Sequence, residues 1–483
     1  MEAVGAALCS ARIARPTHWA APQSSGSSSC SHIVLRVDEH VNGLRSCTGN
    51  STAIGAAVVG AILQVGCRRG RWKRRLGRST GRLLGRKAHA WEDLETLLPS
   101  SQVGTRRYDT ALNPKKPDLP GLTLFRERNG WCPYSERVWL AMEVKGLTYD
   151  TVLVDNMGSR PGWYGGQTPQ VQWQPRERQG ESLDIIRELE DKYPDSGIAL
   201  WPWDEAVTEL VNSFRKIFPQ RSRPSSRAAF LFDQSGPIWR STFEATLDGT
   251  DELLGKHGGP FFFGKSLTVA DCAWAPFLER YAAQLPCLHE GLRPYDASRW
   301  PRLAAWYEAM LQVPAYAARV CGDTVSWRKV LAQAGYGNAG VAPELIEEEA
   351  TVVALGASGM DEAKSQDLWQ QYISSTGASQ QHAATPREEV AAVIVRNRKA
   401  LIKDAMRHGG LSEEDADAGL RGLASLLQEA RDGEPLGSIK FEADPSMQAS
   451  AAYLDDRLCV PRDMGVIPGL ELRKLARELR ERV

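Results

Sequence analysis

The sequence lacks the features that mark metal proteins, disulfide-rich proteins and strongly charged proteins. Its nine cysteines are odd in number and scattered, and none of them are spaced like the ligands of a metal site. This pattern favours free thiols in a reducing compartment and predicts no bound metal. The 59 basic residues balance the 59 acidic residues, so the composition predicts neither a nucleic acid nor an acidic partner.

Acidic residues are almost missing from the amino-terminal part of the chain. Residues 1–90 hold 14 Lys and Arg residues, but their only acids are Glu2, Asp38 and Glu39. The same part is rich in Ser, Gly and Ala. This composition is typical of a transit peptide for an organelle.

An apolar run at residues 53–65 is followed directly by a basic block at 68–75. The run is shorter than the ~20 residues that a membrane-spanning helix needs, which leaves an internal targeting segment or a membrane anchor. The basic block fits either a flank of that run or a nucleic-acid patch. We favour a processed targeting segment and expect no nucleic-acid binding, since no aromatic or folded motif accompanies the charge. Membrane contact near residues 53–65 stays open.

The most informative stretch is an apolar run that leads through a turn into a helical pattern. Residues 122–125 predict a buried strand, and Asn129-Gly130 predicts a turn. Pro133 suits the first turn of a helix, which places Cys132 at or just before the helix amino terminus. The unpaired N–H groups and the positive end of the helix dipole favour an anion there. Cys132 is therefore the candidate for a reactive thiolate.

Further elements follow in the next part of the chain. Residues 135–145 predict a helix, and residues 148–154 predict a second strand. A third strand begins at Thr168-Pro169, with the proline at its entry, and Glu181-Ser182 opens another helix. Strands and helices thus alternate in a compact α/β unit.

The second half of the chain predicts helices. Thr268 and Asp271 form a helix start that resembles a capping box, and the aromatic stripe at 300–311 fits a core face better than a ligand site. From residue 386, two amphipathic segments predict a helical hairpin, and residues 470–483 predict a short charged helix.

These patterns divide the chain into four segments. They are a mostly disordered targeting segment and linker at 1–118, an α/β domain at 119–200, an all-helical domain at 201–330, and a linker with a helical carboxyl-terminal extension at 331–483. Within the last segment, the Ser-, Gln- and Ala-rich stretch near 374–385 also resembles a linker.

The α/β unit resembles the thioredoxin-like, glutathione-binding domain of glutathione transferases. The resemblance is carried by Cys132 at a helix start, Pro169 at a strand entry, and Glu181-Ser182 at a later helix start. The helical unit after it is similar to the all-helical second domain of that family. The resemblance covers residues 120–320. It implies an α/β thioredoxin-like amino-terminal domain, an all-α carboxyl-terminal domain and a helical tail.

Within this family, the order Cys132-Pro133-Tyr134-Ser135 resembles the cysteine-type classes, namely the omega, lambda and dehydroascorbate-reductase-like classes. The tail beyond residue 330 looks similar to that of plastid-type transferase-like proteins of plants and algae. Together with the acid-poor amino-terminal segment, this similarity predicts a chloroplast location.

The resemblance implies a role for each site position. The residues that it assigns to the glutathione site are Cys132, Pro133, Thr168, Pro169, Glu181 and Ser182. Cys132 would be the nucleophile, which forms a mixed disulfide with glutathione. Thr168, before a cis Pro169, would offer its backbone to the cysteinyl part of glutathione. Glu181 and Ser182 would hold the γ-glutamyl end at a helix amino terminus.

The predicted function is that of a glutathione-dependent thiol transferase or dehydroascorbate-type reductase. Ser135 occupies the position of a resolving cysteine, so a second glutathione would have to release the intermediate. Glutathione is then the cosubstrate, and the second substrate is a small disulfide, oxidised or electrophilic compound. A homodimer is also open, because many relatives dimerise.

A second hypothesis is a non-catalytic binding or scaffold protein that kept the transferase fold. It is motivated by the short segment at 163–169, by Ser135 and by the long helical extension. The two hypotheses differ in whether Cys132 exchanges disulfides with glutathione.

Overall fold

The computed structural model describes residues 88–98, 107–128, 130–156, 160–202, 204–218, 240–324, 326–327, 362–375, 382–430, 444–457 and 464–481. The predicted targeting segment before residue 88, with its apolar run at 53–65, lies outside these residues. Among the helices in the described ranges, none is long and apolar enough to cross a membrane.

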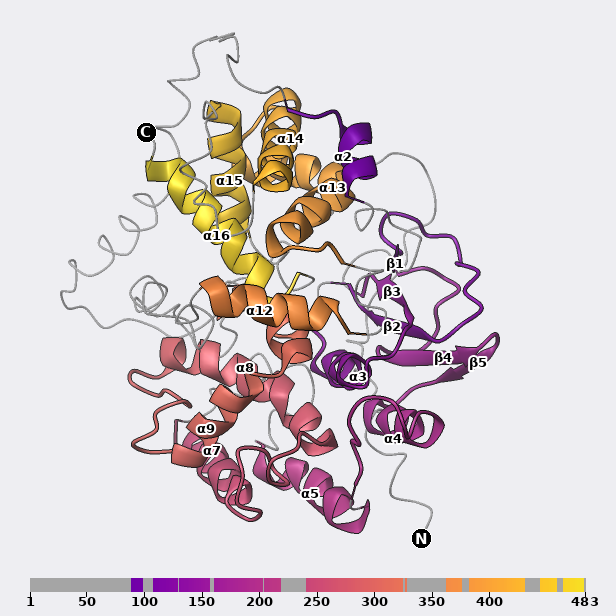
Figure 1. Cartoon of the computed structure of the whole chain (residues 1–483), viewed down its shortest axis with the longest axis vertical. Helices are drawn as coiled ribbons and strands as arrows, with labels where there is room; N and C mark the ends of the chain where they lie inside the picture. Colours follow the sequence, from indigo (N-terminus) through magenta and orange to yellow (C-terminus); the bar gives the residue numbers. More distant parts are fainter. Residues whose placement is uncertain are drawn as a thin grey trace, which may run out of the picture. The chain divides into compact units, whose positions relative to one another are not determined.

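The described residues contain a five-stranded sheet in the order β1-β3-β2-β4-β5 (Figure 1). The strands are β1 (Arg107–Asp109), β2 (Thr123–Glu127), β3 (Asp150–Val154), β4 (Gln170–Gln174) and β5 (Glu177–Gln179). β3 is parallel to both β1 and β2, whereas β4 is antiparallel to both β2 and β5. The three predicted strands are confirmed as β2, β3 and β4.

β1 lies before residue 119, so the predicted start of the α/β domain at that residue is wrong. Arg107 is opposite Thr151 and Asp109 is opposite Leu153 in the parallel ladder with β3. β1 has only three residues and no apolar run, so its own sequence does not predict a strand. Its extended conformation comes from pairing with the edge of β3. The sheet therefore begins inside the segment that was predicted to be a linker.

The two faces of the sheet are covered differently, because neighbouring residues of a strand point to opposite sides. Leu124 joins the large core with α3 (Pro133–Val144) and α4 (Ser182–Lys192). Phe125 points to the other face, where its ring stacks on Tyr164 with 5.6 Å between the centroids. Among the described residues between β3 and β4, this face is covered by a loop rather than a helix.

The second unit is helical, as predicted. It contains α5 (Asp204–Ile217), α7 (Arg240–Leu254), α8 (Val269–Leu288), α9 (Pro301–Met310) and the π-helical segment η4 (Ala315–Val320). Helix α8 packs against both α3 and α5. Trp306 and Met310 of α9 are fully buried, which confirms the core assignment of the aromatic stripe. Cys272 is buried in α8, as a small apolar residue would be.

Helix α8 begins with the capping box that the sequence predicted. The carboxylate of Asp271 accepts hydrogen bonds from the Thr268 backbone N–H at 2.8 Å and from the Trp306 indole N–H at 2.9 Å. Burial raises the pKa of Asp271 to about 6, although these hydrogen bonds lower it in part. The side chain thus joins the start of α8 to the core of α9.

Replacement of Asp271 by alanine is expected to lower the free energy of unfolding by about 2–3 kcal/mol, because buried N–H donors lose their acceptor. Urea denaturation followed by circular dichroism measures this loss. Asp296→Ala is the matched control, since Asp296 accepts from the Ser298 backbone N–H at 3.0 Å but is exposed. Little change is expected there. Equal losses in the two variants would contradict the role of burial.

The carboxyl-terminal extension is helical: α12 (Glu362–Ile373) packs against η4 of the second unit, and the later helices form a bundle (Figure 1). The later elements are α13 (Pro386–Asp404), the π-helical η7 (Ala405–Gly409), α14 (Glu413–Glu429), α15 (Pro445–Arg457) and α16 (Val466–Glu481). Helices α13 and α14 pack together, which confirms the predicted helical hairpin. Together with α15 and α16 they enclose an apolar core of their own.

Two details of the extension were predicted wrongly. The last helix begins at Val466 rather than at residue 470. The linker-like stretch near 374–385 includes His382, which is buried 3.4 Å from the Arg107 guanidinium of β1 and 3.3 Å from the Glu389 carboxylate. Burial lowers the pKa of His382 to about 3, so the ring is neutral near pH 7. This part of the extension is therefore tied to the sheet.

Residues from the predicted amino-terminal linker also pack on the extension. Helix α2 (Trp91–Leu97) contacts α13 and α14. The Trp91 indole N–H donates to the Asp417 carboxylate at 2.8 Å, and His89 Nε2 lies 3.0 Å from the Glu429 carboxylate. The description of residues 1–118 as mostly disordered is therefore wrong for α2 and β1.

Candidate functional site

Cys132 lies between β2 and α3, as the sequence predicted. It is the residue before the helix, Pro133 is the first helical residue, and the Cys132 carbonyl accepts from the Glu136 backbone N–H at 3.1 Å. The Cys132 side chain is half-buried, and its Sγ lies 3.6 Å from the Thr168 carbonyl oxygen, to which the thiol can donate. The helix start and the Thr168 loop thus face each other across the sulfur.

Thr168 and Pro169 are joined by a cis peptide bond, as expected from the strand-entry proline. Thr168 is buried, and its hydroxyl accepts from the Asn156 side-chain amide at 2.9 Å. The sequence did not single out Asn156, because an asparagine after a strand is an ordinary loop residue. The contact fixes the loop that carries the Thr168 carbonyl.

Glu181 and Ser182 open helix α4, also as predicted. Ser182 is the first helical residue and is buried. Glu181 has a φ of 62°, which is a strained value for a residue other than glycine. Such strain is found disproportionately at ligand-binding sites. Backbone N–H groups at a helix start point along the helix axis and form a place where a carboxylate can bind.

Strand pairing brings these three pieces to one edge of the sheet. Phe125, in the middle of β2, is opposite Gln170 at the start of β4, so β2 continues past the start of β4 toward Cys132. Val171 is opposite Gln179, the last residue of β5, which lies two residues before Glu181. The starts of α3, β4 and α4, with their predicted site residues, therefore lie at the same edge.

Tyr164 is a residue near the site that the sequence did not reveal. Burial raises its pKa, and the nearby Cys132 adds to the increase, whereas Arg160 and Arg178 oppose it. The Arg160 guanidinium lies 5.0 Å from the centre of the Tyr164 ring, and the Tyr164 hydroxyl donates to the Gln167 carbonyl at 3.0 Å. The short loop at 163–169 thus supplies an aromatic ring, and Arg160 and Arg178 place cations beside it.

A buried ion pair lies behind Cys132. The Arg280 guanidinium of α8 is 2.9 Å from the Glu136 carboxylate of α3, and both side chains are fully buried. Arg280 also donates to the Trp131 carbonyl at 3.2 Å, and the Trp131 backbone N–H donates to Glu127 at 2.7 Å. Trp131, the residue before Cys132, is therefore held through both its backbone carbonyl and its backbone N–H. No local pattern could reveal this pair, because its partners are 144 residues apart.

Within the described part of the chain, no group of three or more His, Cys, Asp or Glu side chains could hold a metal ion. The groups that the described residues bring together at this edge are a thiol, two helix starts and the backbone beside a cis proline. A cysteine at a helix start beside a cis proline, on such a sheet with a helical second unit, defines a protein with a thioredoxin-like fold.

Comparisons with known proteins agree with this class. The family model for the glutathione S-transferase amino-terminal domain matches residues 131–192, and the model for the carboxyl-terminal domain matches residues 204–309. Glutathione S-transferase L3 of Arabidopsis thaliana is 30% identical over 193 residues, which are 38% of this chain and 77% of the relative. The chain belongs to the glutathione S-transferase family of enzymes.

Two further similarities come from a plant and an alga. The chloroplastic glutathione S-transferase L2 of Arabidopsis thaliana is 27% identical over 196 residues, which are 38% of this chain and 62% of the relative. The crystal structure of the dehydroascorbate reductase of Chlamydomonas reinhardtii is 25% identical, with a TM-score of 0.30. That match covers 41% of this chain and 90% of the reductase.

Proposed function

We propose that this enzyme is a glutathione-dependent thiol transferase or reductase in which Cys132 forms a mixed disulfide with glutathione. The observation that supports the proposal most directly is the position of Cys132 Sγ. It lies at the start of α3 and 3.6 Å from the carbonyl of Thr168, beside the cis Pro169. A helix start stabilises the thiolate, which is the form that attacks a disulfide.

The proposed reaction has two exchange steps. The Cys132 thiolate attacks the glutathione sulfur of a disulfide R–S–S–G, so that a sulfur–sulfur bond forms between Cys132 and glutathione and the original S–S bond to the R–S group breaks. The leaving R–S⁻ takes up a proton from water. The thiolate of a second glutathione then attacks the glutathione sulfur of the intermediate, which forms glutathione disulfide and returns the Cys132 thiolate. The net reaction converts R–S–S–G and one glutathione into R–SH and glutathione disulfide.

Ser135 makes the second glutathione necessary in this scheme. It is buried in the first turn of α3, three residues after Cys132, where a dithiol enzyme would carry its second cysteine. A hydroxyl cannot form a disulfide. The intermediate therefore persists until a thiol from solution reaches it.

The other predicted residues would hold glutathione during both steps. The α-carboxylate of the γ-glutamyl end would bind the N–H groups at the start of α4, with the Ser182 hydroxyl beside it. The Glu181 carboxylate would meet the amino group of the same end. Thr168 would pair with the cysteinyl part of glutathione through its backbone, and Pro133 would flank the sulfur.

The second substrate that we propose is a small disulfide or an oxidised compound such as dehydroascorbate. Conjugation of electrophiles is a weaker candidate, because a cysteine holds glutathione covalently rather than as a free thiolate. We further propose a plastid location, which is supported by the acid-poor sequence before residue 88 and by the chloroplastic relative. A homodimer remains part of the proposal.

Mass spectrometry after incubation with glutathione disulfide tests the proposed intermediate. The peptide that contains Cys132 is expected to gain one glutathione, which a reducing agent removes. Peptides with the buried Cys272 and Cys321 are expected to stay unmodified. An unmodified Cys132 would rule out the mixed-disulfide mechanism.

The scaffold hypothesis is favoured by one observation, namely that the described residues 160–169 between β3 and β4 form a short loop beside Cys132. It predicts that glutathione binds without any exchange reaction. Calorimetric titration with glutathione, compared with the turnover of a disulfide, separates the two hypotheses. Binding without turnover would support the scaffold, whereas turnover would contradict it.

A further inference from the structure

The carboxyl-terminal extension begins its last helix directly on the transferase core. Val466 and Ile467 of α16 belong to the same apolar cluster as the helices around α8. Gly465, just before α16, has a φ of 86°, and a Cβ on it would lie 2.3 Å from the Ala318 carbonyl oxygen of η4. Only glycine allows so close an approach. The start of α16 is therefore built to lie against η4.

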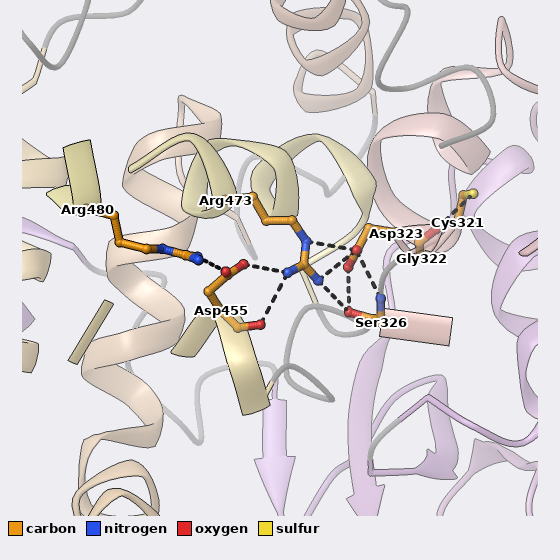
Figure 2. A network of polar contacts seen from close by, with 7 residues as sticks. All are labelled: Cys321, Gly322, Asp323, Ser326, Asp455, Arg473 and Arg480. Atoms are coloured by element: carbon orange, nitrogen blue, oxygen red, sulfur yellow. Dashed lines mark hydrogen bonds and ion pairs between the residues drawn. The ribbon is translucent and has the colours of Figure 1, made fainter. Parts of the chain in front are cut away.

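Arg473 of α16 then binds the segment that follows η4 (Figure 2). Its guanidinium donates to the Asp323 carboxylate through Nε at 3.0 Å and through Nη2 at 2.8 Å. On the other side, Nη1 donates to the Asp455 carboxylate of α15 at 2.8 Å. The Asp323 side chain is buried and also accepts from the Ser326 backbone N–H at 3.1 Å. Arg473 thus links the extension to the segment at 322–327.

The segment at 322–327 is also fastened to α8. The Gly322 backbone N–H donates to the Glu279 carboxylate at 2.7 Å, and the Trp327 indole N–H donates to the same oxygen. The Gln284 amide donates to the Trp327 carbonyl at 2.8 Å. Trp327 is fully buried, and its ring is packed among these groups.

The Trp327 ring in turn lies against the groups that hold Cys132. The Arg280 guanidinium stacks on it, 3.9 Å from the ring centre, and Trp131 packs against it. Arg280 also donates to the Trp131 carbonyl, one residue before Cys132. A continuous series of contacts therefore runs from Arg473 in the extension to the peptide that carries the cysteine.

We propose that the carboxyl-terminal extension positions Cys132. Arg473 holds the 322–327 segment, Trp327 of this segment holds Arg280, and Arg280 holds the Trp131–Cys132 peptide at the start of α3. The three side chains are positioning residues, since they act through one another and not on the substrate. The inference rests on the proposed function in taking Cys132 as the reacting group.

The rate of alkylation of Cys132 by iodoacetamide in the full chain tests this coupling. Arg473→Met and Asp323→Asn both remove the ion pair, and each is expected to slow the reaction by about 2- to 30-fold, the range for coupling through packed side chains. Arg480→Met is the matched control. Arg480 lies on the same helix and binds the same Asp455, but it does not reach Asp323.

Peptide mass spectrometry separates positioning from loss of the fold. Cys272 is buried in α8 and far in sequence from the ion pair, so it becomes labelled only if the core opens. A slower Cys132 with an unlabelled Cys272, and a wild-type rate in Arg480→Met, support the proposal. Wild-type rates in Arg473→Met and Asp323→Asn, or an equal decrease in Arg480→Met, overturn it.

If Arg473→Met does not fold, Asp323→Asn decides alone, because it keeps the size of the buried side chain. If the wild-type protein forms no glutathione adduct on Cys132, the proposed function fails, but the alkylation rates still measure whether the extension positions the cysteine.

Discussion

Replacement of Cys132 by serine is expected to abolish glutathione–disulfide exchange, with a fall in turnover of at least about a thousandfold. A serine hydroxyl stays protonated near neutral pH and cannot form a disulfide, so neither exchange step has a nucleophile. The fold should be unaffected, because Cys132 is half-buried and a serine hydroxyl can donate to the same Thr168 carbonyl. Turnover of a glutathione mixed disulfide, coupled to reduction of glutathione disulfide, measures the loss.

Cys272→Ala is the matched control for this substitution. Burial raises the pKa of the Cys272 thiol well above its ordinary value, so this thiol stays protonated and unreactive. The control is expected to keep its turnover per folded molecule and to lose only some stability. Exchange that continues in Cys132→Ser, or disappears in Cys272→Ala, would contradict the assignment of the nucleophile.

The site positions that could be predicted are those that neighbouring residues define. Pro133 sets the start of α3 and thereby places Cys132, and Pro169 marks a strand entry in the cis form. Ser182 follows the same logic at α4. In each case a proline or a polar residue at an element boundary restricts its own backbone. These signals can be read from the sequence without knowledge of the rest of the fold.

The parts that could not be predicted depend on contacts between distant segments. β1 forms because the edge of β3 offers it a parallel partner, and its three residues carry no pattern of their own. Arg280 and Glu136 meet because α8 packs on α3. An arginine in the middle of an apolar helix is usually read as an exposed residue, and only the packed structure shows that it is fully buried.

The extension shows the same limit. The amphipathic periods of α13 and α14 predict a hairpin, since each helix must bury one face. They do not predict what the extension does to the rest of the molecule. That depends on Gly465, which permits a close approach to η4, and on Arg473, which reaches Asp323 over a separation of 150 residues.

Replacement of Arg280 by methionine is expected to lower the free energy of unfolding by about 3–5 kcal/mol, the usual cost of breaking a buried ion pair. The cation that is lost lies 2.9 Å from the Glu136 carboxylate, and both side chains are fully buried. Urea denaturation measures the change. Lys192→Met is the control, because its i,i+4 pair with Glu188 is partly exposed and should contribute little.

A double variant separates the two roles of Arg280. If Glu136→Gln is added to Arg280→Met, the buried carboxylate charge disappears, and much of the lost stability should return. The hydrogen bond from Arg280 to the Trp131 carbonyl does not return with it. The double variant should therefore be folded but still slow to alkylate at Cys132. A double variant with normal alkylation would mean that Arg280 only neutralises Glu136, and that the position of Cys132 is set by α3 alone.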